Sequence, residues 1–175
     1  MPIVAADIQF RYSGGTTNTS AAACLGGAMS TDAAGVIDTG VANDLWDDVA
    51  SAEASAGDTE YRGFYIKNNH ATLTYSDARA YISPNTTSAD DTFAIAIADE
   101  AVNNAEETIA NESTAPVGPV FSSPADYATG LALNTTTGLT GTSYKGMWIR
   151  RVVTASAAAL TNNSGTVAVQ GDTLS

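Results

Sequence analysis

The single histidine of the chain, His70, is the side chain best suited to proton transfer near neutral pH. It stands in YRGFYIKNNHATLTYSDARAYI, between two runs rich in β-branched and aromatic residues. The preceding pair Asn68-Asn69 tolerates the left-handed conformations of a turn, so we predict a hairpin with His70 exposed at its tip. Catalysis would need a nucleophile or carboxylate within hydrogen-bond reach of the ring, and the sequence does not indicate which residues lie near the turn. We therefore interpret His70 as a turn residue able to make a pH-sensitive contact.

A second candidate for chemistry is the triplet Asp38-Thr39-Gly40, which resembles the catalytic motif of aspartic proteases and follows two apolar residues, as in that family. That mechanism needs two aspartates that share a proton. The chain contains no second Asp-Thr-Gly and no later apolar-apolar-glycine motif followed by arginine and asparagine. Asp38 is the one residue that an enzymatic hypothesis would name. The preferred interpretation is a turn in which its carboxylate binds its own backbone.

Metal and cofactor sites are not indicated by the sequence. Acidic residues gather at 44–48, 90–91 and 99–100, and such oxygen ligands could hold calcium in flexible loops. None of these groups follows the spacing of an EF-hand loop, so we interpret them as solvated surface, with a loop cation at Asp90 and Asp91 as the alternative. The only cysteine, Cys24, excludes an internal disulfide and is interpreted as a small buried hydrophobe. No Cys/His cluster has the spacing of a structural zinc site. We predict no catalytic residue, no cofactor and no metal.

The elements that would position these side chains are mostly strands. Ile8, Phe10 and Tyr12 alternate with polar residues, which is typical of a strand from Ile3 to Tyr12. Further strand-like runs, separated by Asn, Gly, Pro, Ser and Thr clusters, lie at 61–68, 72–82, 92–98, 107–110, 117–121, 144–154 and 166–170. Short strands without alternating helices predict an all-β fold, namely an antiparallel β-sandwich of the jelly-roll or immunoglobulin-like kind, with Trp148 in its core.

One short helix is predicted within NDLWDDVASAEASAGD, with Asn43 or Asp44 as its cap and Gly57 as its end. Its expected apolar patch consists of Leu45, Trp46 and Val49.

The segment from 13 to 40 is dense in Gly, Ser, Thr and Ala, which bury too little apolar area to fold alone. We predict an irregular arm that lies across another subunit. The expected organisation is a strand and extended arm over 1–42 and a β-sandwich domain over 43–175.

Charge narrows the range of partners. Nineteen acidic residues against seven basic ones give a net charge of -12 and a pI near 4.1, which disfavours nucleic acid. No window approaches the roughly 18 to 20 apolar residues of a membrane span, and MPIVAADIQF shows no signal-peptide pattern, so we expect no membrane partner. Arg62, Lys67, Arg150 and Arg151 lie beside aromatic residues, and we expect them to pair with carboxylates. Because Arg150 and Arg151 must face opposite sides of a strand, one of them should be partly buried.

Three runs, LWDDVASAEASAGDTEYRGFYIKNNHATLTYSDARAYI, TIANESTAPVGPVFSSP and MWIRRVVTASAAALTNNSGTVAVQGDT, resemble small virion structural proteins of tailed bacteriophages. The resemblance covers most of the chain after about Asp44 and includes no catalytic signature. It implies a β-sandwich present in many copies on the particle, a capsid decoration or cement protein that bridges shell subunits. The implied partners are the major capsid protein or other virion proteins, and the implied location is the virion, after synthesis in the host cytoplasm.

We therefore expect a non-enzymatic structural protein that forms a homo-oligomer. The alternative is a tail or fibre component in which Tyr65, Tyr75 and Tyr81 stack on a host glycan or receptor. The residues predicted to contact a partner are Ile8, Phe10, Cys24, Leu25, Trp46, Arg150 and Arg151.

Overall fold

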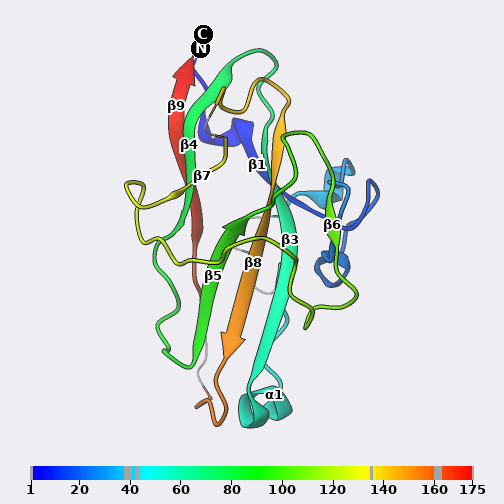
Figure 1. Ribbon diagram of the computed structural model, residues 1–175, viewed down its shortest axis with the longest axis vertical. Coiled ribbons are helices and arrows are strands. Elements are labelled where there is room, and N and C mark those ends of the chain that lie inside the picture. Colours follow the sequence, from blue (N-terminus) through cyan, green and yellow to red (C-terminus); the bar gives the residue numbers. More distant parts are fainter. Residues whose placement is uncertain (1, 38–40, 42–43, 135, 160–162, 175) are drawn as a thin grey trace.

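The computed structural model describes residues 2–37, 41, 44–134, 136–159 and 163–174. In these residues the chain forms antiparallel sheets, one short α-helix and three single-turn 3-10 helices, so the predicted all-β sandwich is confirmed. The molecule is elongated, and its two ends lie next to each other at one pole (Figure 1). There the Ile3 amide donates to Thr173 Oγ1 at 3.1 Å.

The larger sheet has four strands in the order β1-β3-β8-β5. Their bounds are β1 Ile8–Tyr12, β3 Asp58–Asn68, β8 Tyr144–Val153 and β5 Asp91–Ile97. Strand β3 pairs with β8 from Asp58↔Val153 to Lys67↔Tyr144, which makes this pair the spine of the sheet. Because side chains alternate along a strand, Phe64 and Ile66 enter the main core while Gly63 and Tyr65 face the outer side.

The smaller sheet has three strands in the order β7-β4-β9. Their bounds are β7 Leu131–Ala132, β4 Thr74–Ile82 and β9 Val167–Leu174. The register between β4 and β9 shifts between Ser76 and Arg79, a bulge that strengthens the local twist. The main core lies between the two sheets. Its largest buried side chains include Phe64, Ile66, Ile95, Met147 and Ile149 from the larger sheet, and Tyr75, Ile82, Leu133 and Leu139 from the opposite side.

The predicted extended arm is instead folded against its own chain. Residues 13–30 cover the outer face of the larger sheet, where β2 (Gly26–Gly27) pairs with β6 (Glu106–Thr108). The small residues of this segment let backbones meet closely, as where the Gly63 amide donates to the Cys24 carbonyl at 2.8 Å. Strand β1 is hydrogen-bonded along β3, so the two expected parts, 1–42 and 43–175, share one sheet.

A second, smaller core lies under this cover. It contains the buried side chains of Ala96, Ala98, Ile109 and Trp148, with Leu25, Tyr61 and Phe121 packed against them. The prediction of a core position for Trp148 is confirmed, since its side chain is fully buried.

The helix is shorter than predicted. Helix α1 spans Ser51–Ala56, and Gly57 ends it as expected, with φ +80°. The described residues before it, 44–50, are not helical, and side chains of distant strands bind their backbone. The Asp44 carbonyl accepts from the Tyr12 hydroxyl at 2.8 Å, and the Asp47 carbonyl accepts from Arg151 at 2.8 Å.

The hairpin predicted around His70 is wrong. Both flanking strands exist, but β3 belongs to the larger sheet and β4 to the smaller one. The connection over residues 69–73 therefore crosses from one sheet to the other. Both sides of β3 are already taken by β1 and β8, which leaves no edge for β4.

The strand predicted at 117–121 is absent from the structure. Pro116 and Pro119 flank Val117 there, and proline cannot donate to a strand ladder. The segment is a loop, and just after it Ser122 exchanges paired backbone hydrogen bonds with Ile95 of β5.

Candidate functional site

The ring of His70 binds the backbone of residues 69–73, the connection between the two sheets. Its Nδ1 accepts hydrogen bonds from the amides of Thr72 at 3.2 Å and Leu73 at 3.0 Å. The buried side chain of Asn68 donates to the carbonyls of Leu73 and Leu139, each at 2.8 Å. These partners are backbone groups, so His70 is a half-buried structural residue of the crossover.

Two of the residues predicted to contact a partner, Cys24 and Leu25, lie in the segment 13–30 that covers the outer face of the larger sheet. Cys24 has no exposed surface, and burial raises the pKa of its thiol to about 12. The interpretation of Cys24 as a buried hydrophobe is therefore confirmed. Leu25 packs into the smaller core beside Trp148. The contacts of Cys24 are already made within the chain, so it offers no surface to a partner.

Trp46 and Arg151 meet in one cluster on the inner face of the larger sheet. Arg151 Nε donates to Glu60 Oε2 at 2.6 Å, and the two residues are direct neighbours across β3 and β8. The guanidinium carbons of Arg151 and Arg62 lie 5.0 and 5.3 Å from the Trp46 ring centroid. Burial raises the pKa of Glu60, and Arg151 offsets this only in part. Arg62 also pairs with Glu112, so the expected carboxylate pairs are confirmed for Arg62 and Arg151. Within the described residues, Lys67 and Arg150 form no ion pair, so the prediction is wrong for these two.

Arg150 faces the opposite side of β8, as predicted. Its guanidinium lies 5.2 Å from the ring centroid of Phe121 and is half-buried. Trp46 and Arg151 are buried within the chain and do not present a surface, whereas Arg150 keeps part of its side chain accessible.

Ile8 and Phe10 lie on β1 and are half-buried. Phe10 stacks on Phe64, with ring centroids 6.1 Å apart. Both residues line an open hollow of about 610 Å³. We call this hollow the edge groove. It is lined by residues 3–6, 8–10 and 36–37 on one side, and by Tyr75 and residues 169–171 on the other. Of the residues predicted to contact a partner, Ile8 and Phe10 are therefore brought together at an accessible apolar surface.

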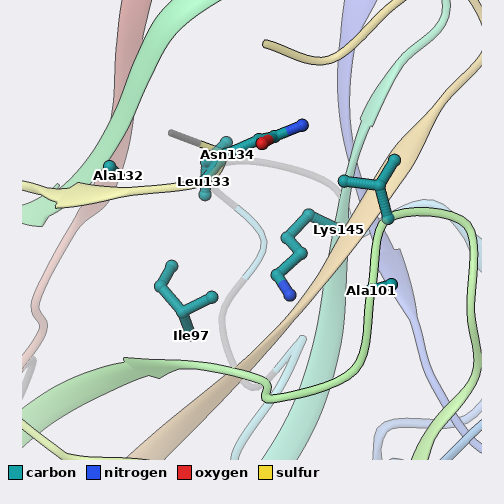
Figure 2. A pocket seen from close by; sticks show the side chains of 7 residues that line it. Ile97, Ala101, Ala132, Leu133, Asn134 and Lys145 are labelled. Atoms are coloured by element: carbon teal, nitrogen blue, oxygen red, sulfur yellow. The ribbon is translucent and has the colours of Figure 1, made fainter. Parts of the chain in front are cut away.

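A second cleft, of about 460 Å³, contains the amine of Lys145. Figure 2 shows Lys145 reaching from β8 into this space, with Ile97 and Leu133 across from its aliphatic stem. The ammonium donates to the Glu100 carbonyl, and desolvation lowers the pKa of Lys145 although Glu100 and Asp99 counteract it. Among the described residues that line the cleft, Asn134 is the only polar side chain apart from Lys145. In this part of the chain the cleft therefore brings no second reactive group to the amine.

Glu106 is a buried carboxyl group that the sequence analysis missed. Its side chain lies on the outer face of the larger sheet, in a hollow formed by two glycines. A Cβ added to Gly146 would lie 2.6 Å from Glu106 Oε1, and one added to Gly63 would also meet the carboxylate. Neither carboxylate oxygen makes a hydrogen bond of good geometry within the described chain. Burial raises the pKa of Glu106 well above its ordinary value. In sequence, Glu106-Glu107-Thr108 is typical of an exposed acidic segment. The only hint that Glu106 is buried lies in Gly63 and Gly146, which are far from it along the chain and leave room for its carboxyl group.

Two tyrosines predicted to stack on sugars, Tyr65 and Tyr75, are buried. The Tyr65 hydroxyl accepts from the Glu106 amide at 2.7 Å and donates to the Gly27 carbonyl. That part of the glycan hypothesis is wrong, because these rings are covered by the protein itself.

The described residues contain no group of three or more His, Cys, Asp or Glu side chains able to hold a metal ion. The candidate triplet Asp38-Thr39-Gly40 lies outside the described residues. In the described part of the chain no helix is both long and apolar enough to cross a membrane.

The sequence matches no protein-family model, and neither curated proteins nor solved structures show a significant similarity to it.

Proposed function

We propose that this chain is a non-enzymatic structural protein of a tailed-bacteriophage virion, which decorates or cements the capsid by bridging shell subunits. The observation that carries the proposal is the edge groove, which leaves the half-buried apolar side chains of Ile8 and Phe10 open at the side of the sandwich. Val4 on its lining is 54% exposed, and Leu174 at the end of β9 is 57% exposed. Apolar side chains gathered in this way are typical of protein contact surfaces.

Two further features support the proposal. The sequence runs quoted above resemble virion structural proteins, and the net charge of -12 favours protein partners over nucleic acid. The Lys145 cleft brings no second reactive side chain to its amine in the described part of the chain, which favours a structural role over a catalytic one. The proposed partners are the major capsid protein or other virion proteins.

The test uses the phage whose genome encodes this chain. Particles made without the gene are mixed with the purified protein, separated by sedimentation and imaged by cryo-electron microscopy. We expect saturable binding and added density at symmetry-related positions on the head. Density on the tail would make the protein a tail component, and particles that bind none of it would exclude a virion role.

A matched pair of variants links binding to the edge groove. Val4→Asp places a charge on the groove lining, whereas Val117→Asp makes the same change at a valine that is 81% exposed outside the groove. We expect the first variant to weaken particle binding and the second to leave it unchanged. Equal loss in both would point to a general charge effect instead of the groove.

A further inference from the structure

The two sheets have four edges, and three of them are covered or short. Strand β1 is bordered by residues 36–37, where the Ile37 amide donates to the Phe10 carbonyl at 2.9 Å. Strand β5 is bordered by the loop at Ser122. Strand β7 has only two residues. Strand β9 has eight residues and, among the residues the structure describes, pairs with β4 alone.

Apart from the hydrogen bond that the Ile3 amide donates to Thr173 Oγ1, the outer edge of β9 has little of the usual protection in the part of the chain that the structure describes. Exposed edge strands generally carry lysine, proline or a bulge, which prevent another strand from adding. Strand β9 reads VAVQGDTL, which contains no Lys, Arg or Pro and a single charge, Asp172. The bulge in this sheet lies on β4 and leaves the outer side of β9 regular. An eight-residue edge of this kind is a template for a further strand.

The edge groove lies where that further strand would sit. The smaller sheet has three strands and faces a sheet of four, and no strand of the described residues lies on the outer side of β9. Ile8 and Phe10 line the groove on the β1 side and Val169 lines it on the β9 side, and all three pack against the main core. An added strand would send alternate side chains into this apolar space while its backbone bonded to β9.

We propose that an extended, basic segment of a partner protein adds to the free edge of β9 as the fourth strand of the smaller sheet. The negative charge of the protein favours a basic segment at this edge. The chain carries -12, its groove is lined by no Lys or Arg among the described residues, and the acidic residues Asp7 and Asp172 are direct sequence neighbours of lining residues. A second copy of the chain would bring a further -12 to the same edge, whereas a segment with lysine or arginine on its outward face complements it. The partner's identity as a virion protein rests on the proposed function, but the geometry does not.

The first experiment needs no partner protein. Two synthetic nine-residue peptides, one alternating valine with lysine and one alternating valine with glutamate, are titrated into the full-length protein at low salt. We expect the lysine peptide to bind at least about tenfold more tightly than the glutamate peptide. We also expect it to slow amide hydrogen exchange in β9 and not in β5, whose edge is already covered. Equal binding of both peptides, or binding without protection of β9, overturns the proposal.

The second experiment measures hydrogen exchange in the protein bound to phage particles. Slower exchange of β9 on the particle supports strand addition. Particle binding with unchanged exchange in β9 overturns the strand-addition proposal while the virion role stands. Protection of β9 that rises with concentration of the protein alone would assign the edge to a second copy and overturn the basic partner. A protein that binds no particle but binds the lysine peptide through β9 retains the edge site and loses the virion role.

Discussion

Replacing Glu106 with glutamine tests whether the carboxyl group of this β6 residue, buried against Gly63 and Gly146, opposes folding once it is ionised. The residue is 4% exposed, and neither carboxylate oxygen makes a hydrogen bond of good geometry in the described chain. In an unfolded chain a glutamate has a pKa of about 4.3. In the folded protein burial raises the pKa of Glu106, and the nearby Met147 amide and Lys145 offset only part of that rise. The folded protein therefore keeps the proton to a higher pH than the unfolded chain does.

The sign and size of the effect follow from this difference in proton binding. Between the unfolded and the folded pKa, only the folded state holds the proton, so stability falls as the pH rises. One proton corresponds to about 1.4 kcal/mol per pH unit. Glu106→Gln does not titrate and escapes this loss. The variant should therefore gain on the wild type by about 1.4 kcal/mol for each pH unit above about 5, until the folded pKa is passed.

The assay is urea unfolding followed by the fluorescence of Trp46 and Trp148, at half-unit steps from pH 4.5 to 9. The pH at which the two stability curves become parallel measures the folded pKa of Glu106. Glu107→Gln is the control, because it removes the same charge one residue along from a half-exposed side chain. A difference between Glu106→Gln and the wild type that stays constant over this range would refute the reasoning.

Three further predictions concern other buried groups. Arg151→Met should destabilise the protein by about 3–5 kcal/mol because it leaves Glu60 buried and unpaired, and adding Glu60→Leu should recover most of that loss in urea unfolding. Cys24 should not react with a thiol reagent at pH 8 in the folded protein and should react completely in denaturant, because it is inaccessible and its pKa is raised to about 12; a fast native reaction would contradict this. Lys145→Met should raise stability at pH 7 by about 1 kcal/mol, since desolvation lowers the pKa of this amine. That gain should vanish above about pH 10.4, where the amine is neutral in both states, and a gain that persists there would show a packing effect instead.

The strands were predictable from strand-like runs separated by turn-forming clusters. The runs at 61–68 and 144–154 indicate strands in this way, and the structure confirms both segments as parts of β3 and β8. The opposite facing of Arg150 and Arg151 follows from the period of two along a strand. Pairing was not predictable, because β3 pairs with β8 more than 70 residues away, and no local signal specifies such a partner. The wrong hairpin at His70 is the direct result.

The candidate site was predictable only in part. Ile8 and Phe10 stand out because they alternate on a strand near an irregular segment, and both line the edge groove. The other half of the groove comes from Val169 and its neighbours, far along the chain. Trp46 is a large aromatic residue of the kind often found at protein contacts, but Arg62 and Arg151 of its own chain cover its ring. The sequence shows that a residue type is suited to a protein contact. It does not show whether that contact is made within the same chain or with another protein.

The strand order has a consequence for synthesis. Strand β8 lies between β3 and β5, and β9 pairs with β4. Neither sheet can therefore be completed until these last two strands have been synthesised. The 46 residues between the end of β5 and the start of β8 take roughly 2–9 s to translate at 5–20 residues per second. During that interval β3 and β5 have their central edges open. A nascent chain stopped before β8 would expose strand edges from both sheets, so a truncated product is expected to aggregate and not to form a smaller domain.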